Sequence, residues 1–92
     1  MELEFDPVKD VRNVNERGIS FERFADMDLT TAVALEDARS DYGERRVRLF
    51  GVIDNRLHVA VVTYRRGTVR VISLRRANRR EERRYAKEAK PS

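Results

Sequence analysis

The N-terminal part of the chain has apolar residues at helical spacing, bounded by residues that begin and end helices. Valines recur at every third position, at Val8, Val11 and Val14. Asp6 followed by Pro7 is typical of an N-cap and a first helical position, and Gly18 fits a left-handed C-cap. The pattern therefore predicts a helix over residues 8–16 whose valines face the protein core.

Two shorter elements flank this predicted helix. Apolar and acidic residues alternate over residues 2–5, which predicts a short first strand. Ser20 is a typical N-cap residue, and the apolar positions after it indicate a second helix over residues 21–27. Helical spacing places Phe21 and Phe24 on the buried face of this second helix.

The pattern changes from helical to alternating near residue 30. Four segments have the alternation or the β-branched content of strands, namely residues 30–35, 45–53, 57–64 and 69–74. Turn residues at 54–55 and 65–67 separate the last three segments, which predicts an antiparallel meander. The polar residues 36–44 indicate an exposed loop, and the nearly continuous apolar run at 57–64 favours a central strand.

A last helix is expected from residue 78. Asn78 and Glu81 have the spacing of a capping box, and Pro91 ends the segment. Together the elements predict an α+β fold for a single domain over residues 1–92. It would have two N-terminal helices, an antiparallel sheet of about four strands and a basic C-terminal helix.

Charge is distributed unevenly along the chain. The last eighteen of the 92 residues carry eight Lys or Arg and three Glu, whereas residues 1–74 carry twelve basic and thirteen acidic side chains. The net charge of +4 therefore comes almost entirely from the C-terminal segment. A concentrated positive field attracts polyanions, and nucleic acid is the first candidate.

Composition excludes several kinds of site. The chain has no cysteine and one histidine, His58, which excludes disulfides, thiolate catalysis and multi-histidine metal sites. Glu36, Asp37 and Asp41 do not have metal-site spacing, so no metal or cofactor is expected. The N-terminus lacks a signal-peptide pattern, and no apolar run approaches the ~20 residues of a membrane span. We therefore expect a cytoplasmic protein.

Several motifs follow one another along the chain. They are Phe5-Asp6-Pro7-x-Lys9 with Asn13, Arg17-Gly18-Ile19-Ser20-Phe21, Arg46-x-x-x-x-Gly51, and Arg70-Val71-Ile72-Ser73-Leu74-Arg75-Arg76-Ala77 running into Arg80-Glu81-Glu82-Arg83-Arg84-Tyr85. In this order the chain resembles the BrnT-type toxins over nearly its whole length. It departs from them at Glu16-Arg17-Gly18, where that family usually has Lys-His-Gly. It also lacks a histidine in residues 37–44, a loop in which the family often has one.

The resemblance implies a fold, an activity and a partner. BrnT proteins are ribonuclease toxins of bacterial type II toxin–antitoxin pairs and have a RelE-like fold. The implied partner is a BrnA-like antitoxin with a ribbon-helix-helix domain, so operator DNA would be contacted only through the antitoxin. The chain has 40% apolar and 39% charged residues, which predicts a thin core and a homodimer within the complex.

The implied chemistry is RNA cleavage by attack of the ribose 2′-OH on its own 3′ phosphate. The nucleophile is already attached to the substrate, so no metal is required, and the planar fork of arginine suits the phosphate oxygens. The candidate catalytic residues are Arg46, Arg75, Arg76, Tyr85 and Lys9. The candidate RNA-binding residues are Arg48, Arg65, Arg79, Arg80, Arg83 and Arg84.

Each candidate also has a purely structural explanation. The arginines would be solvated charges on a sheet face, a turn or a helix, Lys9 a surface lysine, and Tyr85 a packed helix anchor. Two functions follow from these alternatives. One is a metal-independent endoribonuclease. The other, motivated by the missing histidines, is a catalytically weak interaction module that dimerises and docks an antitoxin.

Overall fold

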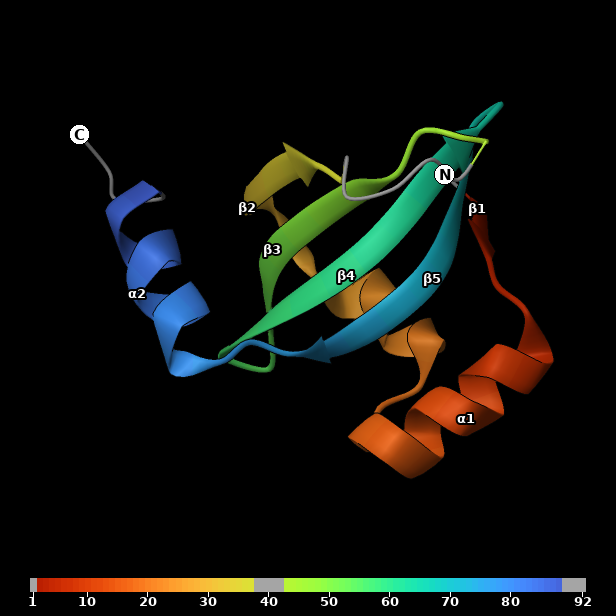
Figure 1. The fold of residues 1–92 in the computed structure, drawn as a ribbon, viewed down its shortest axis with the longest axis horizontal. Coiled ribbons are helices and arrows are strands. Elements are labelled where there is room, and N and C mark those ends of the chain that lie inside the picture. Colours follow the sequence, from red (N-terminus) through yellow and green to blue (C-terminus); the bar gives the residue numbers. More distant parts are fainter. Residues whose placement is uncertain (1, 38–42, 89–92) are drawn as a thin grey trace.

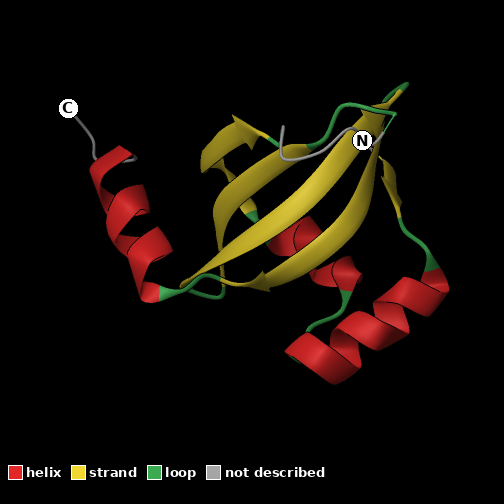
Figure 2. Cartoon of the chain, viewed as in Figure 1, coloured by secondary structure: helices red, strands yellow, loops and turns green. Residues whose placement is uncertain are grey.

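The strands pair into one sheet, with η1 behind it, α1 below β5 and α2 standing to one side (Figure 1, Figure 2). The structure is a computed structural model, and it describes residues 2–37 and 43–88. In chain order the elements are β1 (Glu2–Glu4), α1 (Pro7–Arg17), the 3₁₀ helix η1 (Phe21–Asp26), β2 (Asp28–Glu36), β3 (Val47–Ile53), β4 (Arg56–Arg65), β5 (Thr68–Arg76) and α2 (Arg79–Glu88). The expected α+β architecture is confirmed. Within the described residues there are five strands rather than about four, and the second helix is a 3₁₀ helix.

The sheet is mixed, because its first strand runs parallel to its last. The strand order is β1-β5-β4-β3-β2. Strands β3, β4 and β5 form the predicted antiparallel meander, and β2 extends it beside β3. β1 instead pairs in parallel with β5, with Leu3 opposite Val69. The prediction of a wholly antiparallel sheet was therefore wrong, since alternation within a strand does not reveal the direction of a distant partner.

Two tight turns set the register of the meander. Asp54 and Asn55 have positive φ angles of 50° and 63°, which matches a two-residue hairpin turn whose twist fits the flanking strands. Arg66 and Gly67 form the second turn, with φ angles of 46° and 81°. The first predicted turn is confirmed. Arg65 was wrongly placed in the second turn, because it is the last residue of β4.

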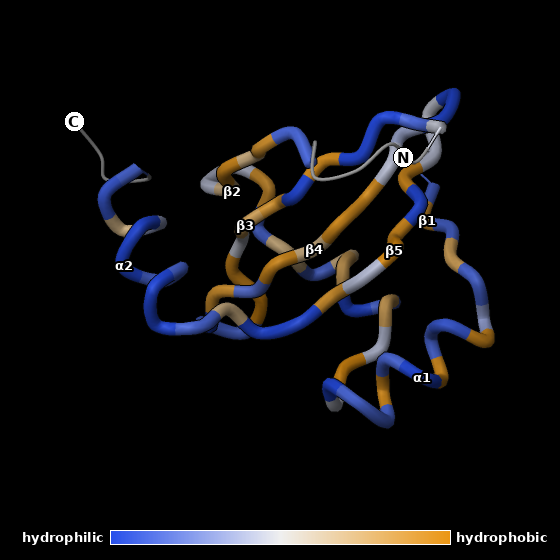
Figure 3. The backbone as a smooth tube through the Cα atoms, viewed as in Figure 1, coloured by the Kyte–Doolittle hydropathy of each residue, from blue (hydrophilic) through white to orange (hydrophobic). Residues whose placement is uncertain are grey.

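The main core lies on the face of the sheet that η1 covers. It is made of Phe21, Phe24, Met27, Leu49, Ile53, Ala60, Val62, Val69, Val71 and Leu74. Alternate residues of β4 are buried on the opposite face, namely Leu57, Val59 and Val61. β4 is therefore buried on both faces, in agreement with its apolar run, which is orange along most of the strand in Figure 3.

Helix α1 turns its polar side, not its valines, toward the rest of the protein. Val8, Val11 and Val14 are 71%, 61% and 43% exposed, so the prediction that they face the core was wrong. The inner side carries Asp10, whose carboxylate accepts the Phe21 N–H at 2.7 Å. It also carries Asn13, whose amide donates to the carbonyl of Leu74 at 2.8 Å. β1 pairs with residues 68–70 of β5. Further along β5, the Asn13 side chain supplies a hydrogen-bond donor to the carbonyl of Leu74.

Several element boundaries differ from the predictions by a few residues. β2 begins at Asp28 rather than residue 30, and β3 begins at Val47, so that Arg46 precedes it. β5 ends at Arg76 rather than residue 74, which places both Arg75 and Arg76 inside the strand. Within the predicted loop, Glu36 belongs to β2, and residues 38–42 lie outside the described residues.

Candidate active site

Helix α2 is held to the sheet through two polar contacts. In its first turn Glu81 receives two hydrogen bonds from the Arg75 guanidinium of β5, at 2.8 and 2.9 Å. One turn further on, the Tyr85 hydroxyl donates to the carbonyl of Thr31 in β2 at 2.9 Å. No residue of α2 is buried. The helix therefore extends from the end of β5 toward β2 and is attached mainly by polar groups.

The predicted capping box begins this helix. The Asn78 side chain accepts the Glu81 N–H at 2.8 Å, and the Glu81 carboxylate accepts the Asn78 N–H at 2.9 Å. Hydrogen bonds from Arg75, then the N–H of Asn78 and the charges of Arg75 and Arg48, hold the pKa of Glu81 below its ordinary value of 4.5, although partial burial opposes this. Glu81 is therefore a carboxylate at neutral pH and is held between two arginines.

Arg48 of β3 lies on the same face of the sheet as Arg75. Its guanidinium carbon is 5.9 Å from the ring centroid of Phe50, two residues along the strand. The Nε of Arg48 is buried, and it has no hydrogen-bond partner among the residues described. A buried unpaired donor is costly, so contacts among the described residues do not by themselves explain the position of this side chain.

A hollow of about 230 Å³ brings three arginines together from three elements. They are Arg17 of α1, Arg48 of β3 and Arg75 of β5, and we call this space the cationic hollow. It is also lined by Asn13, Val59, Val61, Ser73 and Leu74. Within the ranges that the structure describes, no carboxylate lines it. Arginines that share a hollow with the hydroxyl-bearing Ser73 suit a phosphate or another anion.

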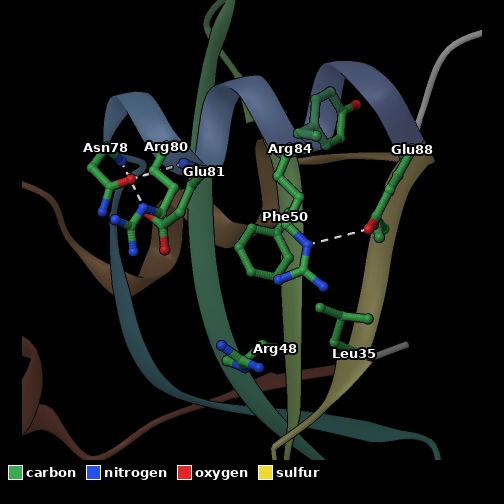
Figure 4. Close-up of a pocket in the computed structure, with 10 residues that line it drawn as sticks. Leu35, Arg48, Phe50, Asn78, Arg80, Glu81, Arg84 and Glu88 are labelled. Atoms are coloured by element: carbon green, nitrogen blue, oxygen red, sulfur yellow. Dashed lines mark hydrogen bonds and ion pairs between the residues drawn. The ribbon is translucent and has the colours of Figure 1, made fainter.

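A second hollow, of about 290 Å³, lies beneath α2 and is called the helix pocket here (Figure 4). Its sheet side is formed by Val33, Leu35, Arg48 and Phe50, and its helix side by Asn78, Arg80, Glu81, Arg84, Tyr85 and Glu88. In Figure 4, Arg48, Phe50 and Leu35 lie below the helix, and Arg84 points down toward Phe50. Arg48 lines both hollows, so the two spaces adjoin at this residue.

Sequence comparison relates this architecture to a known family. A family model described as the ribonuclease toxin, BrnT, of type II toxin-antitoxin systems matches residues 5–81. The chain belongs to the BrnT family. The crystal structure of the Brucella abortus ribonuclease toxin BrnT has a similar fold, with a TM-score of 0.68 and 19% identity over 86% of this chain and 99% of that chain. No curated protein sequence matches the chain significantly.

Membership of the BrnT family confirms the resemblance drawn from the sequence motifs. The family consists of ribonuclease toxins of type II toxin–antitoxin systems, so an antitoxin partner is implied. The likeness to the Brucella BrnT structure is at low sequence identity and shows a shared fold. A relation of that fold to RelE stays a prediction.

The structure brings some of the predicted site residues of this BrnT-family chain together and separates others. Arg48 and Arg75 meet at the cationic hollow, and Arg80, Arg84 and Tyr85 line the helix pocket. Arg76 pairs with His58 in the β4–β5 ladder, so strand alternation turns its side chain to the opposite face from Arg75. Arg75 and Arg76 therefore lie on opposite faces of β5, which does not support the expectation that both act at one phosphate.

The remaining predicted residues line neither hollow. Arg46 and Arg65 both pair with Glu44, at 3.6 and 2.5 Å, and these ion pairs hold the pKa of Glu44 below its ordinary value, Arg65 contributing most. Lys9 lies on α1 beside a separate depression with Arg12. Arg79 and Arg83 are exposed on α2. Glu44 is therefore an acidic partner of Arg46, whereas the charge of Arg48 acts on Glu81 without an ion pair between them.

Several residues at the two hollows were not among the predicted site residues. They include Asn13, Arg17, Phe50, Ser73 and Glu81. Asn13, Arg17, Ser73 and Glu81 belong to the motifs that carry the family resemblance, and Phe50 shares strand parity with Arg48. These residues come from elements that are distant in sequence, so only the folded chain brings them to the two hollows.

Neither a membrane span nor a metal cluster is found among the residues that the structure describes. No helix there has the length and apolar character needed to cross a bilayer. No group of three or more His, Asp or Glu side chains lies close enough together to hold a metal ion.

Acid should loosen the attachment of α2. The pKa of Glu81 is lowered in the folded protein, so its contribution to stability is complete above its ordinary value of 4.5 and is lost as pH falls through its folded-state value. As pH falls below 4.5 we expect amide NMR signals of α2 to shift and its hydrogen exchange to accelerate.

The control for this acid effect is a neighbouring glutamate. Glu81→Gln should show weak attachment across the whole pH range, whereas Glu82→Gln, at an exposed position in the same turn, should keep the wild-type transition. Identical pH profiles for wild type and Glu81→Gln would contradict the assignment.

Proposed function

We propose that this chain cleaves RNA at the cationic hollow, with Arg48 and Arg75 binding the scissile phosphate. The ribose 2′-oxygen attacks the adjacent phosphorus, the bond to the 5′-oxygen breaks, and a 2′,3′-cyclic phosphate and a 5′-hydroxyl result. The observation that carries the proposal is the convergence of Arg17, Arg48 and Arg75 on one hollow in a member of a ribonuclease family. Preorganised guanidinium groups stabilise the charge that develops on the phosphate oxygens.

Glu81 is the residue we propose as the base for the 2′-hydroxyl. Its carboxylate accepts two hydrogen bonds from Arg75 and lies where α2 meets the sheet. While these bonds are intact its pKa is low, which makes it a weak base. A phosphate that draws the Arg75 guanidinium toward itself would weaken the pair and raise the pKa of Glu81. The carboxylate then takes the 2′-hydroxyl proton, and the leaving 5′-oxygen takes a proton from solvent.

In this proposal the cleavage of RNA requires no metal ion. The attacking oxygen belongs to the substrate, so no metal-bound water is needed as the nucleophile. The arginines supply the positive charge at the phosphate. Such a reaction takes place where RNA is present, and the proposal therefore includes a cytoplasmic location.

The antitoxin implied by the family is proposed to be BrnA-like, with a ribbon-helix-helix domain that contacts operator DNA. The exposed valines on α1, Val8, Val11 and Val14, supply apolar surface for assembly with this partner or with a second copy of the chain in the complex. Inactivation by the antitoxin follows if the assembly blocks access to the cationic hollow.

One observation favours a second function. Glu81 occupies two donors of Arg75, the fork that a phosphate would use. If α2 never releases this fork, the chain is a catalytically weak module that dimerises and docks an antitoxin for operon control. The two functions differ in whether the folded chain degrades RNA.

The test is incubation of the purified chain with end-labelled RNA in the presence of EDTA. Cleavage that leaves 2′,3′-cyclic phosphate and 5′-hydroxyl ends, and that stops when the neighbouring antitoxin is added, is the expected result. Products with 5′-phosphate ends would refute attack by the 2′-hydroxyl. Intact RNA with folded protein that still binds the antitoxin would establish the interaction module.

A further inference from the structure

The helix pocket has one aromatic side chain from the sheet and one from the helix. Phe50 of β3 lines it from the sheet, together with the aliphatic residues Val33 and Leu35. Tyr85 of α2 lines it from the helix, and the hydrogen bond from its hydroxyl to Thr31 fixes where its ring lies. Figure 4 shows the space between the helix and the residues Phe50, Arg48 and Leu35. Apolar and aromatic walls of this kind suit a flat, uncharged ring.

Polar groups lie around these apolar walls. Asn78 lies at one end of the pocket, and at the other Arg84 donates to Glu88 at 3.2 Å. A volume of about 290 Å³ is at the small end of ligand pockets, and it suits a single heterocycle rather than a peptide segment. Hydrogen-bonding groups around an apolar slot match the edges of a nucleobase.

The position of Arg48 connects this pocket with the phosphate site. Its guanidinium lies over Phe50, and the residue lines both the helix pocket and the cationic hollow. An arginine between the two spaces can contact a phosphate on one side and the ring attached to the same nucleotide on the other. The two hollows therefore have the arrangement of two parts of one nucleotide site.

We infer that the helix pocket binds an unstacked nucleobase of the RNA next to the phosphate held in the cationic hollow. This inference rests on the proposed function and specifies its substrate. The base must leave its neighbours in order to enter, so single-stranded RNA is the substrate class. Phe50 and Tyr85 hold the base, while Arg48 and Arg75 hold the phosphate.

Binding of an uncleavable RNA tests the pocket separately from catalysis. The probe is a 2′-O-methyl RNA hexamer, and its dissociation constant is measured by fluorescence anisotropy with the full chain. Phe50→Leu keeps an apolar side chain but removes the aromatic ring, and we expect it to weaken binding about tenfold, within the range of one stacked base. Tyr64→Leu is the matched control, since Tyr64 is 50% exposed and lines neither hollow.

Removal of single bases from the hexamer identifies the one that Phe50 contacts. For wild type, one abasic position should weaken binding about tenfold, and Phe50→Leu should show no further loss at that position. If the loss of affinity from Phe50→Leu and the loss from the missing base multiply in full at every position, the inference is overturned. Unchanged RNA binding by Phe50→Leu with weakened antitoxin binding would also overturn it and would assign the pocket to the protein partner.

Failure of the pocket and failure of the proposed function give different results. If RNA is cleaved normally, but the effects of Phe50→Leu and of each missing base on affinity are independent, the base pocket is refuted and the proposed function is not. If the effects of Phe50→Leu and of one missing base on affinity are not independent, but no RNA is cleaved, the base pocket is supported and the proposed chemistry is refuted. Folding of each variant is checked by circular dichroism, and Phe50→Tyr, which retains an aromatic ring, should restore the wild-type affinity.

Discussion

Arg75→Gln should reduce RNA cleavage by about 10²- to 10³-fold, the usual effect of removing one strong donor from a charged transition state. Arg75 lines the cationic hollow at the end of β5 and is hydrogen-bonded to Glu81, the proposed base. Glutamine retains polar atoms but loses both the charge and the two-pronged geometry. The measurement is the single-turnover rate with end-labelled RNA at saturating enzyme, which separates the chemical step from binding.

Two neighbouring substitutions make this result specific. Arg75→Lys should restore only part of the rate, because a lysine ammonium is a single point charge without the planar fork. Arg76→Gln removes the same charge one residue away, but its side chain is on the opposite face of the sheet, so the rate should stay near that of wild type. Equal losses in the Arg75 and Arg76 variants would show that overall positive charge, and not the hollow, accounts for the activity.

Leu74→Ala should lower the free energy of unfolding by about 3 kcal/mol, through lost apolar burial and the cavity left behind. Leu74 is 0% exposed and belongs to the main core. Small domains have about 5–15 kcal/mol in total, so the variant should unfold at a clearly lower urea concentration. Urea denaturation followed by circular dichroism measures the difference.

The control for Leu74 is a valine that the sequence pattern had placed in the core. Val11 is 61% exposed, so Val11→Ala should change the free energy of unfolding by less than about 0.5 kcal/mol in the isolated chain. A loss of more than about 1 kcal/mol would mean that α1 packs through its valines after all. The pair of variants thus tests the orientation of α1 as well as the core.

The attachment of α2 links the predictions about Glu81, Arg75 and Phe50. The helix forms one side of the helix pocket, carries the proposed base and is joined to the sheet by the Arg75–Glu81 pair and the Tyr85–Thr31 bond. An element without buried residues has little apolar contact to resist local opening. We therefore expect α2 to move when RNA reaches Arg75, and hydrogen exchange of α2 with and without RNA measures this movement.

Local sequence was sufficient for features that depend on residues close together in the chain. The capping box of Asn78 and Glu81, the turn at Asp54-Asn55 and the doubly buried strand β4 were all predicted and are confirmed. Each depends on backbone preferences or burial patterns over a few residues. The family motifs also lie within short segments, which is why the resemblance was visible without a structure.

The orientation of α1 and the parallel pairing of β1 were predicted wrongly or missed. Asp10 and Asn13 bind groups in η1 and β5, and these partners became visible only when the chain was folded. Valine spacing alone pointed to the wrong side of the helix. Apolar periodicity identifies a helix, but the side that packs depends on what its polar residues meet elsewhere in the fold.

The sequence alone predicted the excess of basic residues near the C-terminus, the α+β class and the family. It could not predict which arginines share a hollow, because β5 has a register shift opposite Val61 and Val62, before Arg75. In a strand, a one-residue change of register reverses the face of every following side chain. Pairing across the sheet therefore placed Arg75 on the same face as Arg48 and Arg76 on the opposite face. This arrangement depends on contacts between segments far apart in sequence.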